Sequence, residues 1–136
     1  MLKVIGFSLT VLVIIITASS FTQTTNLAES IERGKGLYAL YCQKCHSEDG
    51  TGQAGTYPPL ANADYMKKPD KDLIAVILNG QSGEVTVNGI VYNDDMQPLN
   101  YLTDEQIADV LNYTKNTWGN KSTTAIKPEE VKQARQ

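Results

Sequence analysis

The stretch Cys42-Gln43-Lys44-Cys45-His46 contains both cysteines and the single histidine of the chain. Two thiols three positions apart can each bond to one vinyl group of a haem, and a histidine directly after the second thiol then lies beneath the iron. This spacing is the signature of c-type haem attachment. The sequence therefore predicts one covalently bound haem c, attached at Cys42 and Cys45, with His46 as an iron ligand.

A zinc site, a thioredoxin-like thiol pair and a plain disulfide each agree less well with the sequence around these residues. A structural zinc site uses about four Cys and His ligands, whereas this chain offers three, side by side. A thioredoxin-like pair opens a helix, whose N-terminus lowers a thiol pKa. Here the residues before Cys42 are predicted to be helical, so the thiols fall at the opposite end. A disulfide is compatible with an exported chain, but it leaves His46 without a role.

Gly34 lies eight residues and Tyr38 four residues before Cys42. With these positions, the stretch 26–118 resembles the class I monohaem cytochromes c, in particular exported bacterial ones and the haem c domains of periplasmic oxidoreductases. The resemblance implies an all-α, cytochrome c-like fold around one haem, and transfer of single electrons rather than enzymatic catalysis. It also implies that a proline carbonyl holds the iron-binding histidine, with a leucine two residues later. Pro58 and Leu60 stand at these positions.

The chain divides into four parts. Residues 1–20 resemble a secretory signal peptide, since Lys3 precedes an almost unbroken apolar run with small residues at its end. The run is about 15 residues long, short of the roughly 20 that span a bilayer, although an uncleaved anchor stays open as an alternative. A linker (21–25), a cytochrome c domain (26–119) and a C-terminal tail (120–136) follow. We therefore expect a periplasmic protein, or one at the extracytoplasmic face of the membrane.

The formal net charge of the 136 residues is -3, and loss of the leader and two haem propionates would make the mature protein more acidic. An acidic protein is unsuited to nucleic acid or to an anionic membrane surface. We expect redox proteins as partners, contact with a membrane only through a retained leader, and a monomer.

The first predicted helix follows Asn26 and runs toward Cys42, with Glu29 placed as in a capping box. Gly34 and Gly36 would each cost a helix about 1 kcal/mol relative to alanine. Their presence indicates that another helix approaches closely, and a helix that breaks near Gly34 is the alternative.

Further elements are predicted after the motif. A helix is expected over 69–78. Asn88-Gly89 between two alternating segments predicts a β-hairpin over 85–92, either folded over the distal side of the haem or lying as a surface loop. Thr103 begins a capping box for the last main helix, which is predicted to end at 118–119. The tail is expected to lie on the surface, with a short helix from Pro128.

The second iron ligand is predicted to be a methionine, because no second histidine exists and methionine is common in electron-carrying c haems. Met1 would leave with the leader, which leaves Met66 and Met96. Met96 is favoured, because it stands in a loop before the last helix and is closely followed by Pro98, as in the family. Gln97 intervenes where the family often has proline. Met66 stands in a charged stretch and is expected to fill the core.

These residues together predict a one-electron carrier with His46 and Met96 as axial ligands. Two alternatives remain. A haem enzyme or gas-binding sensor would need an open sixth position and polar residues near it, and the lack of a second histidine counts against this class. A dedicated cytochrome subunit of a larger oxidoreductase would share the chemistry and differ only in its partner.

Overall fold

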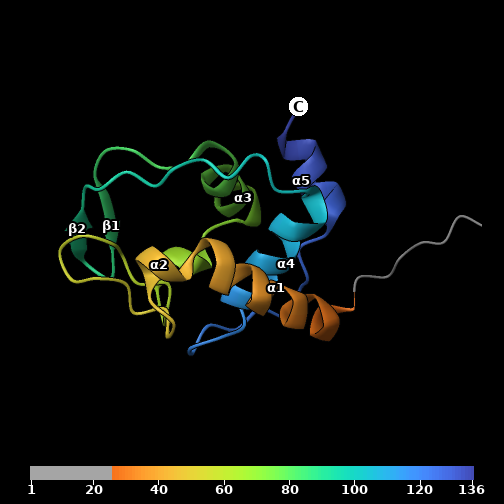
Figure 1. Cartoon of the computed structure of the whole chain (residues 1–136), viewed down its shortest axis with the longest axis horizontal. Coiled ribbons are helices and arrows are strands. Elements are labelled where there is room, and N and C mark those ends of the chain that lie inside the picture. The colour runs from red at the N-terminus through yellow and green to blue at the C-terminus, as the bar shows by residue number, and fades with distance from the viewer. Residues whose placement is uncertain (1–25) are drawn as a thin grey trace, which may run out of the picture.

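The computed structural model describes residues 26–136, so the predicted leader and linker lie outside the described residues. The elements are α1 (Leu27–Tyr41), α2 (Gln43–His46), the 3-10 helix η1 (Asp64–Lys67), α3 (Asp70–Asn79), β1 (Val85–Val87), β2 (Ile90–Tyr92), α4 (Asp104–Thr114) and α5 (Pro128–Ala134). The predicted helical fold with one small hairpin is confirmed (Figure 1). None of the helices in this part of the chain has the length and apolar character needed to cross a bilayer.

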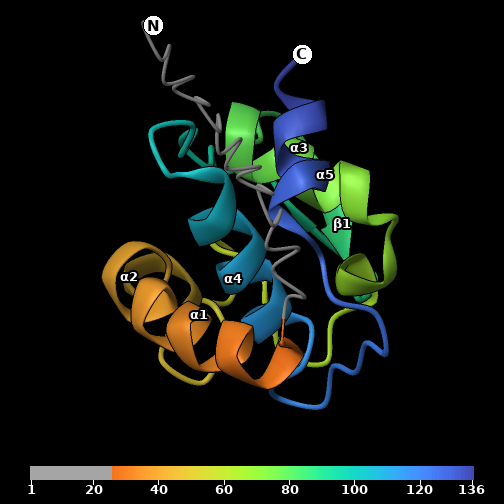
Figure 2. The ribbon, with the colours of Figure 1, turned by 90° about the vertical axis from the view of Figure 1, so that its right-hand side faces the viewer.

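Helix α1 crosses α4 closely at Gly34 (Figure 2). A Cβ atom at Gly34 would lie 2.0 Å from the carbonyl oxygen of Asp109, a distance that no side chain can tolerate. The predicted close approach is therefore confirmed at this position. The same interpretation of Gly36 is wrong, because a Cβ there would meet nothing within 4 Å.

The two predicted capping boxes have different outcomes. At α4, the Thr103 hydroxyl accepts from the Gln106 amide and the Gln106 side chain accepts from the Thr103 amide, so the reciprocal box is formed. At α1, the Asn26 side chain accepts from the Ala28 amide. Glu29 accepts from the Asn26 side chain and not from its backbone, so Asn26 caps the helix without a reciprocal box.

Helix α4 ends at Thr114, earlier than predicted, because the chain turns there to pack a half-buried aromatic ring against α1. Trp118 adopts a left-handed conformation (φ 53°), and its ring packs 4.9 Å from that of Tyr38. The side chain of Asn120 donates to the Thr114 carbonyl, a group that a longer helix would have bonded internally. The aromatic cluster, completed by Tyr113, fixes α1 to the chain after α4.

The predicted hairpin is confirmed, with β1 and β2 antiparallel and Asn88-Gly89 at its tip. Both tip residues have positive φ, as the tightest hairpin turns require. Asp64 and Asn88 exchange two hydrogen bonds of 2.9 Å between side chain and backbone amide. The hairpin is thereby held against the start of η1.

The C-terminal segment is part of the core, contrary to the expectation of a tail on the surface. The predicted helix from Pro128 is present as α5, but Ile126 and Val131 are fully buried. The Asn112 side chain both donates to the Ile126 carbonyl (2.9 Å) and accepts from its amide (2.8 Å). This buried pair of bonds fixes the segment to α4.

Candidate haem site

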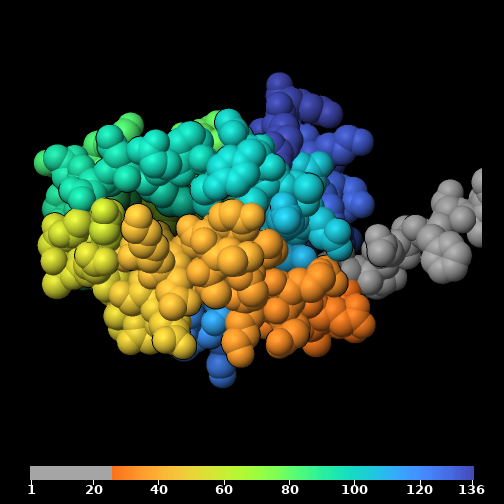
Figure 3. All heavy atoms as spheres, in the orientation of Figure 1, coloured from red at the N-terminus to blue at the C-terminus, as the bar shows by residue number. Residues whose placement is uncertain are grey.

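An apolar cavity of about 250 Å³ lies between α2, α3, α4, the hairpin and the segment 94–99. In the space-filling view, the chain around the motif and the chain before α4 meet along a seam on this face (Figure 3). The cavity wall includes every residue for which the sequence predicts a haem contact, namely Cys42, Cys45, His46, Pro58, Leu60 and Met96. The fold thus brings together residues more than fifty positions apart.

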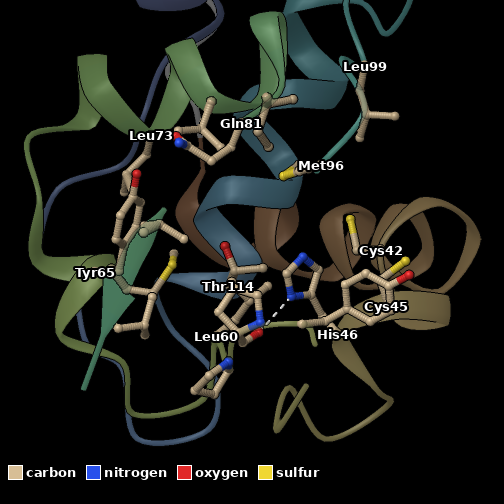
Figure 4. Close-up of a pocket in the computed structure, with 18 of the residues that line it drawn as sticks. Cys42, Cys45, His46, Leu60, Tyr65, Leu73, Gln81, Met96, Leu99 and Thr114 are labelled. Carbon is tan, nitrogen blue, oxygen red and sulfur yellow. Dashed lines mark hydrogen bonds between the residues drawn. The ribbon is translucent and has the colours of Figure 1, made fainter. Parts of the chain in front are cut away.

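The imidazole of His46 is oriented by one hydrogen bond (Figure 4). Its Nδ1 lies 3.0 Å from the Pro58 carbonyl oxygen. Because a carbonyl only accepts, Nδ1 carries the proton and Nε2 keeps its lone pair for a metal. Burial lowers the pKa of His46, against a smaller opposing effect of the Pro58 bond. The ring is therefore neutral at pH 7, which is the form that binds iron.

The two thiols are half-buried, and neither forms a disulfide. Cys42 follows the last residue of α1, and Cys45 lies within the short α2. Burial, with a smaller contribution from Cys45, raises the pKa of Cys42 to about 12. A dithiol oxidoreductase needs the opposite shift, so the environment of Cys42 argues against thioredoxin-like chemistry.

The backbone of Met96 is held against the chain that follows α3. Its amide donates to the Gln81 carbonyl (2.8 Å), and its carbonyl accepts from the Gln81 amide (3.0 Å). Gly80 permits this approach, because a Cβ there would lie 2.3 Å from the Met96 carbonyl oxygen. Three residues on, the Leu99 amide donates to the Ile77 carbonyl. Sequence reasoning missed both Gly80 and Gln81 as site residues, because a glycine after a helix indicates only where the helix ends and Gln81 carries no local signal.

Met66 also borders the cavity and is 7% exposed, as a core-filling side chain would be. Met96 and His46 enter the cavity from opposite sides in the close-up (Figure 4). Both methionines of the described chain therefore border the space that a bound group would occupy. Only Met96 has its backbone held by the pair of hydrogen bonds to Gln81.

The remaining walls suit a flat apolar macrocycle. They are formed by aliphatic side chains of α3, the segment before α4, and α4, including Leu73, Ile77, Leu99, Val110 and Leu111. The hairpin contributes Val85 and Val87, so it is a wall of the cavity and not merely a surface loop. No group of three or more His, Cys, Asp and Glu side chains within residues 26–136 could hold a separate metal ion. Two thiols, a neutral imidazole and an apolar slot together fit a haem c.

Comparison with known proteins agrees with this chemistry. The cytochrome c family pattern matches residues 31–118. The chain is 38% identical to cytochrome c-552 of Thermus thermophilus over 127 residues, which cover 88% of this chain and 85% of that protein. It is also 35% identical to the fructose dehydrogenase cytochrome subunit of Gluconobacter japonicus, over 86% of this chain but 23% of the subunit. The chain therefore belongs to the cytochrome c family, as a class I monohaem member with one covalently attached haem c.

Proposed function

We propose that this chain carries single electrons between redox proteins outside the cytoplasmic membrane, with His46 and Met96 as the axial ligands of its haem. Membership of the family supports electron transfer itself. The anchoring of Met96 to Gln81 by two backbone hydrogen bonds, across the cavity from His46, supports the ligand pair. We further propose that it works as a monomeric carrier and not as an enzyme.

The chain contributes attachment, orientation and exclusion of water. A haem c held here would supply the one-electron chemistry of its iron. Cys42 and Cys45 tie the group to the chain, and Pro58 keeps Nε2 of His46 directed into the cavity. The Met96 thioether supplies a neutral ligand of the kind that raises the reduction potential. Because the backbone hydrogen bonds hold Met96 and the cavity is apolar, little of the surroundings has to move when the charge changes.

The ligand pair is tested by the weak red-edge charge-transfer band of iron–sulfur ligation in the ferric protein. We expect the wild type to show the band, Met96→Ala to abolish it, and Met66→Ala to retain it as the matched control. Loss of the band in Met66→Ala alone would make Met66 the ligand instead.

A gas-binding or enzymatic function would require an accessible sixth position. A tethered methionine acts at an effective concentration of about a millimolar or more, so an external ligand must displace it. We expect ferrous wild type to bind carbon monoxide poorly at neutral pH and Met96→Ala to bind it readily. Rapid, stoichiometric binding by the wild type would favour the gas-binding class.

A dedicated subunit is the second candidate, because several dehydrogenase cytochrome subunits are similar to this chain over about a quarter of their length or less. Elution of the native protein from its host as a monomer would support the free carrier. Co-elution with a dehydrogenase would support the subunit.

Export is proposed from residues 1–20 and from the family. N-terminal sequencing of the native protein should find a start near Phe21 in the periplasmic fraction. An intact Met1 in the membrane fraction would show that the leader is retained as an anchor.

A further inference from the structure

We infer that Arg135, at the end of α5, is a positioning residue for the segment that carries Met96. The inference rests on the proposed ligation by Met96. It gives the C-terminal segment a role in ligand binding, although none of its residues borders the cavity.

The guanidinium of Arg135 binds three groups of the chain that connects Met96 to α4. Nε donates to the Asp104 carboxylate (2.6 Å), Nη1 to the Asn100 carbonyl (2.8 Å) and Nη2 to the Leu102 carbonyl (2.5 Å). A planar guanidinium can reach three acceptors at once because its donors form a rigid fork. One side chain thus fixes both the connecting segment and the first residue of α4.

Two of these bonds are made to the part of the segment that lies between Leu99 and the cap of α4. Met96 is held by Gln81, just after α3, and Leu99 is held by Ile77, within α3. Beyond Leu99 the chain is exposed at Asn100 and Tyr101, and it returns to the core at Leu102, which is 4% exposed. Figure 1 shows this connection passing beside α5. Arg135 therefore adds two hydrogen bonds to a stretch that is otherwise held by the packing of Leu102.

Helix α5 provides a rigid base for this contact. Val131 is fully buried, and Ile126 is held by the Asn112 side chain through two buried hydrogen bonds. The position of Arg135 is therefore set by α4 and the core. Because α4 also lines the cavity, fixing the segment 100–104 to α5 fixes it relative to the cavity wall.

The segment that carries Met96 can adopt two arrangements in equilibrium. In the first the Met96 sulfur is at the ligand position, and in the second it has moved away from that position. Contacts made only in the first arrangement lower the population of the second. Because withdrawal of Met96 pulls on residues 100–102, the two carbonyl bonds of Arg135 stabilise the first arrangement. An external ligand that takes the methionine position should bind more tightly once these bonds are removed.

The test is imidazole binding to the ferric holoprotein, followed by loss of the charge-transfer band. Arg135→Ala should bind imidazole about three- to tenfold more tightly than wild type, as expected for loss of charged hydrogen bonds at a partly exposed site. Arg135→Lys keeps the charge but not the fork, and its affinity should lie between the two. Lys132→Ala, an exposed position on the same helix, should bind imidazole as the wild type does.

A second control separates positioning from a general loss of stability. Lys115 pairs with Asp70 and ties the end of α4 to the start of α3, away from the segment 96–104. Lys115→Ala should lower the unfolding midpoint yet leave imidazole affinity unchanged. If the wild type shows the band but Arg135→Ala gains less than about threefold, or Lys115→Ala gains as much, the inference is wrong and the His46/Met96 proposal stands. A wild type without the band would overturn both.

Discussion

Replacing Gly34 by alanine should loosen the packing of α1 on α4. The new Cβ would lie 2.0 Å from the Asp109 carbonyl oxygen, whereas ordinary contacts begin near 3.4 Å. The helices must therefore separate locally by roughly 1.4 Å, and a gap of even about 0.5–1 Å forfeits a quarter to a half of the dispersion energy across it. Such overpacking costs about 1–3 kcal/mol and sometimes more. The 2.0 Å approach places Gly34→Ala at the upper end, about 3 kcal/mol, and the helix propensity of alanine offsets about 1 kcal/mol of this, leaving a net loss of about 2 kcal/mol.

Gly36→Ala is the matched control, since it makes the same chemical change on the same helix with nothing within 4 Å of the new atom. It should stabilise the protein by about 0.5–1 kcal/mol. The assay is urea unfolding of both holoprotein variants. With a slope of about 2 kcal/mol per molar, Gly34→Ala should lower the midpoint by about 1 M and Gly36→Ala should raise it slightly. Equal or same-direction shifts would refute the argument from close approach.

Other positions allow further tests. In Gly80→Ala the new Cβ would press against the Met96 carbonyl, and a residue with a side chain would have to adopt a φ of +74°, so the charge-transfer band should weaken. An unchanged band would show that the backbone around Met96 can shift without loss of ligation. Burial raises the pKa of Tyr38, whose hydroxyl donates to the Ser47 carbonyl. Its contribution to stability is therefore present below its ordinary pKa of about 10 and is lost as the pH rises above that value; in Tyr38→Phe the alkaline fall in the unfolding midpoint should be smaller. Val131→Ala should cost about 2 kcal/mol by creating a cavity, and a loss below about 0.5 kcal/mol in urea unfolding would mean that α5 is a surface tail after all.

Features encoded by neighbouring residues could be predicted from the sequence. The capping box at Thr103 and the Asn88-Gly89 turn each depend on a few adjacent residues whose backbone conformations they determine. Gly34 could be interpreted because a glycine in a helix is costly unless something approaches closely. For the candidate site, the two thiols and His46 also stood out from local spacing, whereas the role of the Pro58 carbonyl was implied by the family resemblance; the structure brings all of them to one cavity.

What the sequence did not reveal depends on contacts between distant residues. The bonds between Gln81 and Met96 join backbone groups, which any residue type could supply. The Asn112 side chain bonds the backbone of Ile126, and no residue type at Ile126 marks it as the partner. The early end of α4 has the same origin, because packing of the half-buried Trp118 ring against Tyr38 outweighs further helical turns. Gly36 was misinterpreted because a solvent-facing glycine and an interface glycine look alike in sequence.

The packing of α1 on α4 also means that the molecule should stay assembled when the backbone between these two helices is cut. The two helices hold the ends of a long closed loop, and the entropy of that closure changes only slowly with loop length. Asn88 and Gly89 lie exposed at the hairpin tip, so a protease could cut there without first opening the core. One fragment would carry α1 and the haem, and the other would carry Met96 and α4. Exchange of fragments between cut molecules would then measure how strongly one half of this protein recognises the other.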